Sequence, residues 1–249
     1  MKIESLNNDK VKYWCKLKEK KFRDQEGLFL VEGDHLLNEA LVQGCVKEII
    51  SLEESFQIPD IPFYQVTETI MKKISNQVSI APVIGVCEKI KPRKIKGNVC
   101  ILDDIQDPGN LGTIIRSAVA FSIDTIVLSN GTVDLYNEKV VRASEGMIFN
   151  LNFIREDLNS FLPYIKEQGY FIYGTDVSQG NLLKKVHFPE KSAIIIGNEG
   201  RGMHKEYVSF CDTLLHIPIN SYCESLNAGV AASIIFYEMN NVNEEGLKR

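Results

Sequence analysis

The sequence predicts an α/β protein of two domains, the second of which holds a mostly parallel sheet covered by helices on both faces. Beyond residue 97, short apolar runs alternate with segments of helical periodicity, as they do in strand–helix–strand units. Residues 88–98 are rich in charge and contain Pro92 and Gly97, which is typical of a domain boundary. The chain of 249 residues is long enough for two modest domains. We therefore expect a small domain over residues 1–90 and a larger one over residues 97–243.

The small domain is expected to be a mixed α/β unit and the larger one to alternate regularly. In the first, residues 28–31 and 46–52 have strand-like patterns, and residues 34–43 have a helical pattern closed by Gly44. In the second, strands are expected at 99–102, 125–128, 151–154, 170–174, 193–197 and 214–217. Helices are expected at 111–121, 136–143, 158–168, 204–211 and 225–239.

Composition limits the classes of protein to which the chain can belong. Its apolar runs are too short to cross a bilayer, and the residues after Met1 lack the apolar core of a signal peptide. We therefore expect a cytoplasmic protein with no membrane partner. The six cysteines are scattered with no C-x-x-C pair, which favours reduced thiols over a zinc site or a disulfide framework. No bound metal is expected.

Charge is distributed unevenly along the chain. The net charge of −5 disfavours a nucleic-acid partner, yet residues 1–23 carry eight lysines and arginines against three acidic residues. If residues 8–23 form one helix, four of the basic residues share one side of it: Lys12, Lys16, Lys20 and Arg23. This basic face is suited to phosphates, and a solvated lysine face with no partner is the equal alternative.

Three loops that follow expected strands have unusual sequences, and ligands bind at this end of the strands in open α/β sheets. The first loop runs through DPGNLG at 107–112 into a helix, for which Asn110 is the expected N-cap. Arg116 lies off the buried stripe of that helix. It either pairs with a carboxylate on the surface or takes part in the chemistry of the loop.

The second loop, GNEGRG at 197–202, has three glycines that either let a backbone approach a ligand or form a tight turn. The third loop runs from IP at 217–218 to SLN at 225–227 and enters a helix of small residues, which Ser225 or Asn227 is expected to cap. The chain has neither the Gly-Lys-Ser/Thr of a P-loop nor the G-x-G-x-x-G of a dinucleotide site. ATP hydrolysis and NAD binding therefore lose their usual support.

In this order, the three loops resemble the signature motifs of the SpoU/TrmH family of RNA 2′-O-methyltransferases, within the SPOUT superfamily. DPGNLG with Arg116 resembles the first motif, GNEGRG the second, and IP with SLN the third. Residues 140–146 (VVRASEG) are similar to a stretch between the first two motifs. The N-terminal part is similar to the substrate-binding domain that many members carry. Two departures, Ser122 where glycine is frequent and Ala228 where a branched residue is frequent, affect only local packing.

The resemblance implies a catalytic domain with a deep C-terminal trefoil knot, an S-adenosyl-L-methionine cofactor and a homodimer. The catalytic residues that it implies are Asn110, Arg116, Glu199, Ser225 and Asn227. The cofactor-binding residues that it implies are Thr175, Gly197, Ile217 and Leu226. We expect RNA contacts at Lys12, Lys16, Lys20, Arg23, Arg142 and Ser144. Whether Arg116 acts in its own subunit or in the partner's site is left open.

The reaction that the family catalyses explains why these residue types are needed. Methyl transfer to a ribose hydroxyl is an in-line displacement on a sulfonium methyl, so the enzyme must align two ligands and stabilise negative charge on the oxygen. A guanidinium stays protonated at neutral pH, so Arg116 is better suited to that stabilising role than to the role of a general base. The final proton acceptor is left open.

The expected function is methylation of a ribose 2′-hydroxyl in RNA. Ribosomal RNA is preferred because the N-terminal domain resembles those of ribosomal RNA enzymes, and transfer RNA is the alternative. The motif set disfavours a knotted methyltransferase that acts on a base nitrogen. A non-catalytic RNA-binding factor is disfavoured because no motif has decayed, and a nicotinamide oxidoreductase because the glycine fingerprint is missing.

Overall fold

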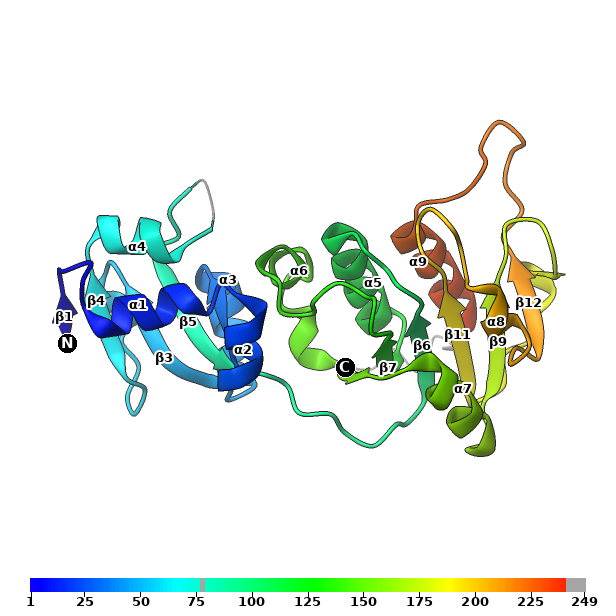
Figure 1. The fold of residues 1–249 in the computed structure, drawn as a ribbon, viewed down its shortest axis with the longest axis horizontal. Coiled ribbons are helices and arrows are strands. Elements are labelled where there is room, and N and C mark those ends of the chain that lie inside the picture. The colour runs from blue at the N-terminus through cyan, green and yellow to red at the C-terminus, as the bar shows by residue number, and fades with distance from the viewer. Residues whose placement is uncertain (77–78, 241–249) are drawn as a thin grey trace. The chain divides into compact units, whose positions relative to one another are not determined.

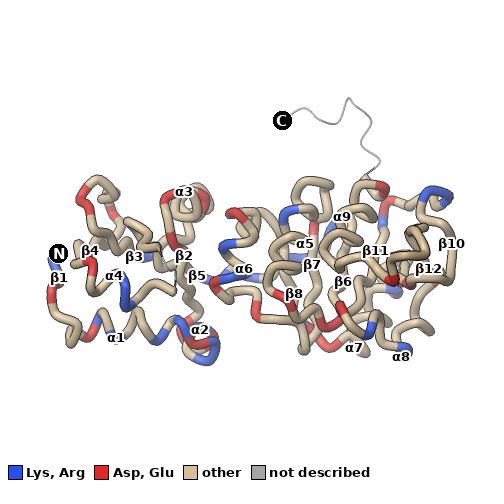
Figure 2. The backbone as a smooth tube through the Cα atoms, turned by 90° about the horizontal axis from the view of Figure 1, so that it is seen from above, with Lys and Arg blue, Asp and Glu red and all other residues tan. Residues whose placement is uncertain are grey.

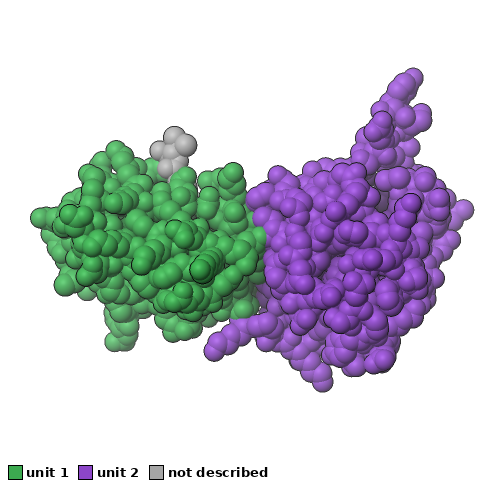
Figure 3. Space-filling model, in the orientation of Figure 1, with its two compact units in different colours: residues 1–90, 134–149 green, residues 91–133, 150–249 purple. Residues whose placement is uncertain are grey.

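A computed structural model describes residues 1–76 and 79–240 of the chain. The chain forms two compact units, which Figure 3 shows in different colours. Of the described residues, the first unit contains 1–76, 79–90 and 134–149, and the second contains 91–133 and 150–240. The expected domains need one correction, because residues 134–149 were placed in the second domain and pack with the first unit. Residues 241–243 of the expected larger domain lie outside the described residues.

The first unit is built on a five-stranded sheet with the order β1-β4-β3-β5-β2. Its strands are β1 (Lys2–Ile3), β2 (Leu28–Glu32), β3 (Val46–Ser51), β4 (Phe63–Val66) and β5 (Val83–Glu88). Its helices are α1 (Asp9–Lys16), α2 (Lys20–Glu26), α3 (Asp34–Val42), α4 (Glu68–Ile74) and α6 (Glu138–Ala143). The expected elements β2, α3 and β3 are confirmed.

Helices cover both faces of this sheet. Trp14 of α1 and Ile70 of α4 pack with Ile84 of β5 in one apolar core. The next residue of β5, Gly85, faces the other way, and a Cβ there would lie 2.9 Å from the side chain of Leu37 in α3. Gly85 therefore allows α3 to approach the sheet closely.

The N-terminal basic residues do not share one helix. Residues 8–23 form α1 and α2 with a turn between them. Arg23 stabilises this turn, because its guanidinium donates hydrogen bonds of 2.9 and 2.5 Å to the carbonyls of Leu17 and Lys18. The expectation of a single helix was therefore wrong.

The second unit has a seven-stranded sheet with the order β10-β12-β9-β11-β6-β7-β8, and all its neighbouring strands are parallel. The strands are β6 (Asn98–Leu102), β7 (Ile123–Leu128), β8 (Asn152–Arg155), β9 (Phe171–Thr175), β10 (Asn181–Leu182), β11 (Ser192–Ile196) and β12 (Thr213–His216). The helices are α5 (Pro108–Ala120), α7 (Leu158–Glu167), α8 (Lys205–Val208) and α9 (Ala228–Met239). The mostly parallel α/β sheet is confirmed. The sequence analysis did not anticipate β10 in this unit, nor β1, β4 and β5 in the first.

Two layers of helices cover this sheet (Figure 1). The core on one side joins α7 and α8 to inward residues of the strands, such as Ile101 and Ile172. On the other side α5 and α9 pack against each other, and a Cβ on Gly229 would lie 3.0 Å from Cβ of Thr113. The small residues of α9 therefore serve close helix packing. None of the described helices is long and apolar enough to cross a membrane.

Ser122 lies in a backbone conformation that favours glycine. Its φ is +57°, in the left-handed region, two residues beyond the end of α5. Glycine has no Cβ penalty there, which gives a physical reason for the frequent glycine of the family pattern. Serine at this position therefore strains the turn after α5, and the helix itself is intact.

Candidate active site

The first motif loop is shaped by the start of α5. The helix begins at Pro108, and the carboxylate of Asp107 caps it by accepting a 2.8 Å hydrogen bond from the backbone N–H of Asn110. Asn110 is therefore not the N-cap that the sequence analysis expected. Proline is favoured at the first helical position, which moves the cap to the residue before it. As a result, the buried Asn110 side chain is available for contacts outside its own helix.

Glu199 joins the second loop to the first. Its carboxylate accepts hydrogen bonds from the Asn110 side chain at 2.9 Å and from the backbone N–H groups of Asp107 and Gln106 at 3.1 and 3.2 Å. Partial burial raises the pKa of Glu199, but these hydrogen bonds together outweigh it and bring the pKa below its usual value. Glu199 is thus an ionised acceptor that holds two loops together, which disfavours it as the final proton acceptor.

Asn227 joins the third loop to the same group. It caps α9, because its Oδ1 accepts a 3.2 Å hydrogen bond from the backbone N–H of Val230. Its Nδ2 donates a 2.7 Å hydrogen bond to Oδ1 of Asn110. The amide of Asn110 therefore lies between Glu199 and Asn227, and hydrogen bonds connect three of the five expected catalytic residues from three separate loops.

Arg116 and Ser225 are not part of this network. Both are exposed, Arg116 on α5 and Ser225 two residues before the cap of α9. Within the described residues, neither side chain makes a hydrogen bond or an ion pair. The alternative that Arg116 pairs with a surface carboxylate is therefore not supported. Both side chains are free to contact a ligand.

The GNEGRG loop is a tight turn that the chain itself requires. Asn198 and Gly202 exchange backbone hydrogen bonds of 3.0 and 2.9 Å. The Asn198 side chain accepts from the backbone N–H of Gly200 and donates to the carbonyl of Asp104 at 2.7 Å. A Cβ on Gly197 would lie 2.2 Å from the backbone nitrogen of Met203. The sequence analysis did not single out Asn198, which holds this turn against the first loop.

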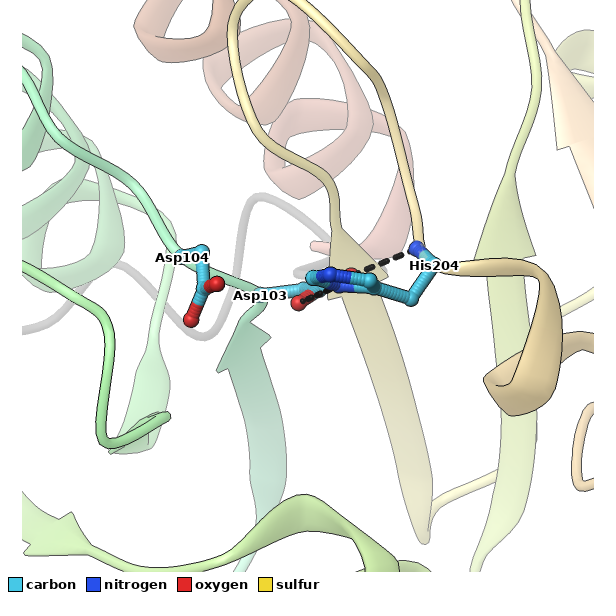
Figure 4. Close-up of side chains that lie close together, drawn as sticks. All are labelled: Asp103, Asp104 and His204. Atoms are coloured by element: carbon cyan, nitrogen blue, oxygen red, sulfur yellow. Dashed lines mark hydrogen bonds and ion pairs between the residues drawn. The ribbon is translucent and has the colours of Figure 1, made fainter.

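Asp103, Asp104 and His204 lie close together beside the second loop (Figure 4). Buried Asp103 accepts a 2.7 Å hydrogen bond from the backbone N–H of His204, and its other oxygen lies 2.7 Å from the His204 Nδ1. Asp104 forms an ion pair with Arg201 and accepts a 2.6 Å hydrogen bond from Ser129. A cation bound here would have to displace these internal donors. The contacts instead fix the carboxyl-terminal part of the GNEGRG turn, and His204 beyond it, to the end of β6.

The four expected cofactor residues lie at the carboxyl ends of neighbouring strands or beside the third loop's cap. Thr175 ends β9 and donates a 2.9 Å hydrogen bond to the carbonyl of Ile195 in β11. Gly197 follows β11, and Ile217 follows β12. Because β12, β9 and β11 are adjacent, the loops after them leave the same edge of the sheet. Leu226 precedes Asn227 and is partly buried.

Two of the residues that were expected to contact RNA are buried, so this expectation was wrong for them. Arg23 is only 5% exposed and pairs with Asp134 at 2.5 Å. Ser144 is fully buried, and its hydroxyl donates a 2.7 Å hydrogen bond to the carbonyl of Val141. Neither side chain can reach a phosphate in this structure. The helical spacing of basic residues did not distinguish an arginine that stabilises a turn from one that faces solvent.

The other expected RNA contacts are exposed in the first unit. Lys12 pairs with Asp9, and Lys20 pairs with Asp24. Lys16 lies over the ring of Phe22, with its Nζ 5.5 Å from the ring centroid. Arg142 is exposed at the end of α6. Exposed pairs of this kind contribute little to stability, so these cations can exchange their partners for phosphates.

Comparison with known proteins identifies the family of both units. The family model of the SpoU rRNA Methylase family matches residues 97–237. The model of the MRM3-like substrate binding domain matches residues 8–85. Together the two models cover most of the chain and meet near the boundary between the compact units.

Relatives match over almost their whole length. The 23S rRNA (guanosine(2553)-2′-O)-methyltransferase RlmP of Bacillus subtilis is 36% identical over 244 residues, which cover 95% of this chain and 98% of that protein. The crystal structure of an rRNA methyltransferase from Sinorhizobium meliloti is 27% identical, with a TM-score of 0.88 and 96% of each chain covered. Its form with bound AdoMet is 26% identical, with a TM-score of 0.86. The chain therefore belongs to the SpoU rRNA methylase family and is an S-adenosylmethionine-dependent RNA 2′-O-methyltransferase.

Proposed function

We propose that this chain methylates the ribose 2′-hydroxyl of a guanosine in 23S ribosomal RNA. The single observation that carries the proposal is the 36% identity to an enzyme named for that reaction, which extends over both units of the chain. A match confined to the catalytic unit would support the reaction without supporting the substrate. We also propose that the protein acts in the cytoplasm, where ribosomal RNA is assembled in bacteria.

The test is methylation of RNA transcripts that lack modifications. The purified chain is incubated with S-adenosylmethionine carrying a labelled methyl group and with either 23S ribosomal RNA or transfer RNA. We expect label in 23S RNA, at one guanosine. The phosphodiester bond on the 3′ side of that guanosine should then resist alkaline cleavage, because its 2′-oxygen is methylated. Incorporation into transfer RNA alone would contradict the substrate, and label on a base would contradict the site of transfer.

The residues at the carboxyl ends of β9, β11 and β12 fit S-adenosylmethionine. Ile217 and Leu226 are half-buried apolar side chains that suit the adenine ring. Among the described residues, the backbone of Leu226 makes no hydrogen bond, so it is free to bind a ligand. Thr175 and Gly197 complete the set. When bound, the cofactor would supply a methyl group on a sulfonium, and these residues would hold it.

The catalytic roles divide between a free guanidinium and a fixed network. We assign to Arg116 the stabilisation of the ribose oxygen as it loses its proton, because this exposed cation has no ion-pair partner among the described residues. The network holds the three loops together through the side-chain hydrogen bonds of Asn110 with Glu199 and Asn227. Ser225, next to the cofactor residue Leu226, presents a free hydroxyl at the same loop.

Replacing Glu199 with glutamine is expected to lower the rate of methyl transfer by about tenfold. The amide of glutamine has a single acceptor oxygen, so it cannot accept from all three N–H groups that bind the two carboxylate oxygens. The loss is discounted because Glu199 is partly exposed. The pKa of Glu199 is lowered in the folded chain, so its contribution is present above the usual carboxyl pKa and lost as the pH falls through the lowered value. The variant should lack this acidic loss of activity. Rates measured from pH 7 downward test this expectation.

The matched control is Glu224→Gln, which removes an exposed carboxylate from the third loop. It should retain both the parent rate and the parent pH profile. The positioning role of Glu199 would be contradicted if its glutamine variant kept the acidic limb unchanged.

We further propose that the second unit contains a trefoil knot. The strand order supports it: β11 lies between β6 and β9, although β9 precedes it in the chain, and β12 then lies on the far side of β9. After β12 the chain returns to α9, which packs on α5 near the start of the unit. A trefoil knot, in which the last segments pass through an earlier loop, accounts for this return of the chain.

We also propose a homodimer, with α9 in the interface. Val230 and Tyr237 of α9 are large apolar side chains left exposed in the single chain. Light scattering should give about twice the chain mass of 28.1 kDa. A monomer at micromolar concentration would contradict this state. Lys12, Lys16, Lys20 and Arg142 remain our candidates for RNA contacts of the first unit.

A further inference from the structure

A hollow of about 500 Å³ lies in the second unit, between the amino ends of β9 and β12 and the edge strand β10. Its lining includes Phe171, the first residue of β9, and Thr213, the first residue of β12. The cofactor candidate Thr175 lies at the other end of β9, four residues and therefore about 13 Å along the strand. The hollow is thus separate from the network of Asn110, Glu199 and Asn227.

One wall of the hollow is a row of aromatic rings. Phe171 is 39% exposed, and its ring centroid lies 4.8 Å from that of Tyr173. Tyr173 in turn lies 4.9 Å from the ring of buried Phe188, and its hydroxyl donates a 3.3 Å hydrogen bond to the carbonyl of His187. These contacts hold Phe171 in place while part of its ring faces solvent. A fixed, exposed ring is a stacking platform for a nucleobase.

The charges around the platform suit a phosphate. Lys185 lines the hollow, and Lys184 precedes it in the short 3-10 helix of residues Leu183–Lys185. Neither lysine forms an ion pair with another described residue. Figure 2 shows this basic segment beside β10. The acidic lining residue, Asp212, is already neutralised by Lys166 at 2.8 Å and by the backbone N–H of Ile172 at 2.8 Å.

We propose that this hollow binds a second nucleotide of the RNA substrate, with its base stacked on Phe171 and its phosphate beside Lys185. The size is adequate, because pockets for small organic groups span roughly 300–1,000 Å³. The inference rests on the RNA methyltransferase activity and adds a contact remote from the reacting ribose. Stacking tolerates any base, so the site contributes affinity and orientation more than sequence choice.

The first test compares RNA binding by Phe171→Ala and by the parent chain. The alanine variant should bind RNA roughly 5- to 150-fold more weakly, the range for losing one stacked base. S-adenosylmethionine affinity should be unchanged, because Phe171 lies far from the cofactor loops. The melting temperature should fall by only a few degrees, because the ring is 39% exposed and packs mainly on Tyr173. Tyr164→Ala is the matched control. Tyr164 is an exposed aromatic residue of α7, a helix that packs on the other face of the sheet.

The second test places a reporter in the hollow. Phe171→Trp keeps the stacking surface, so it should retain parent RNA affinity, and its emission should be quenched when RNA binds. Trp14, the tryptophan of the natural chain, is fully buried in the first unit and contributes a constant background. The Tyr164→Trp variant should show no quenching. Lys185→Glu should weaken binding and reduce the slope of log affinity against log salt by about one.

The parent chain is first titrated with unmodified 23S ribosomal RNA and with transfer RNA. The RNA that it binds more tightly is then used for all the variants. Tighter binding of transfer RNA would contradict the proposed substrate without affecting this comparison. Parent-like binding by Phe171→Ala, or an unquenched Phe171→Trp variant with RNA bound, would overturn the hollow as an RNA site. Quenching by guanosine monophosphate but not by RNA would also overturn it, in favour of a free-nucleotide site.

Discussion

Replacement of Arg116 by alanine is expected to slow methyl transfer by roughly 10²- to 10³-fold, the scale for losing one preorganised donor to a developing oxyanion. The charge of Arg116 acts mainly as the ribose oxygen loses its proton. The fold and S-adenosylmethionine binding should remain nearly intact, because the side chain is exposed on α5 and makes no hydrogen bond or ion pair with a described residue. Single-turnover methylation, cofactor titration and thermal melting measure these three properties separately.

Two further substitutions sharpen the test of Arg116. Arg116→Lys should recover little of the rate, because it keeps the charge and loses the planar fork that contacts the oxygen and an orienting group together. Arg93→Ala is the matched control, since Arg93 is another exposed arginine of the same unit without an ion pair to any described residue. It should methylate at the parent rate. Near-normal transfer by Arg116→Ala would rule out the proposed role.

The proposed dimer allows a test of which site Arg116 completes. Arg116→Ala and Asn227→Ala chains are each expected to be impaired alone. A mixed dimer contains one chain of each variant. If Arg116 acts across the interface, the intact Arg116 of the Asn227→Ala chain completes the site of the Arg116→Ala chain, whose network is intact. One of the two sites is then active. An arginine that acts within its own chain would restore none. The recovered fraction of activity therefore distinguishes the two arrangements, and exchange of subunits is checked with differently tagged chains.

The regular part of the fold could be predicted from the sequence because its signal is local. The six expected strands of the second unit are all present, since buried parallel strands are short continuous apolar runs such as the one that forms β11. Elements with weaker signals were missed. β10 has two residues, and its pairing with β12 depends on the tertiary fold rather than on its own pattern. The packing of residues 134–149 with the first unit likewise depends on distant contacts.

The candidate site could be predicted as a set of residues but not as a network. The motifs identified Asn110, Glu199 and Asn227, yet only the structure shows that the Asn110 amide bridges the other two. The proposed cap at Asn110 was wrong because Pro108 starts the helix one turn earlier and transfers capping to Asp107. A proline directly after an aspartate was the signal that could have indicated this. The hollow at Phe171 had no sequence signal, because its lining comes from separate strands and loops.

Arg23 has the helical spacing of a surface residue but is buried. Its replacement is expected to lower the stability of the first unit strongly. Arg23→Met should lower the free energy of unfolding of the first unit by about 3 kcal/mol, the lower end for removing one partner of a buried ion pair. The change leaves Asp134 with no cation and removes the donors to the carbonyls of Leu17 and Lys18. It therefore loosens the turn between α1 and α2 and its attachment to the segment that begins at Asp134.

Trp14 provides the measurement, because it is fully buried in the same unit and its Nε1 donates a 2.8 Å hydrogen bond to Glu48. Its fluorescence during urea denaturation follows the first unit even if the two units unfold separately. Lys21→Met, at an exposed position of α2, is the control and should change stability by less than about 0.5 kcal/mol. Asp134→Asn combined with Arg23→Met should recover part of the loss, because the orphaned carboxylate is then gone. If the Arg23→Met variant were as stable as the parent but bound RNA more weakly, Arg23 would instead be a residue that contacts RNA.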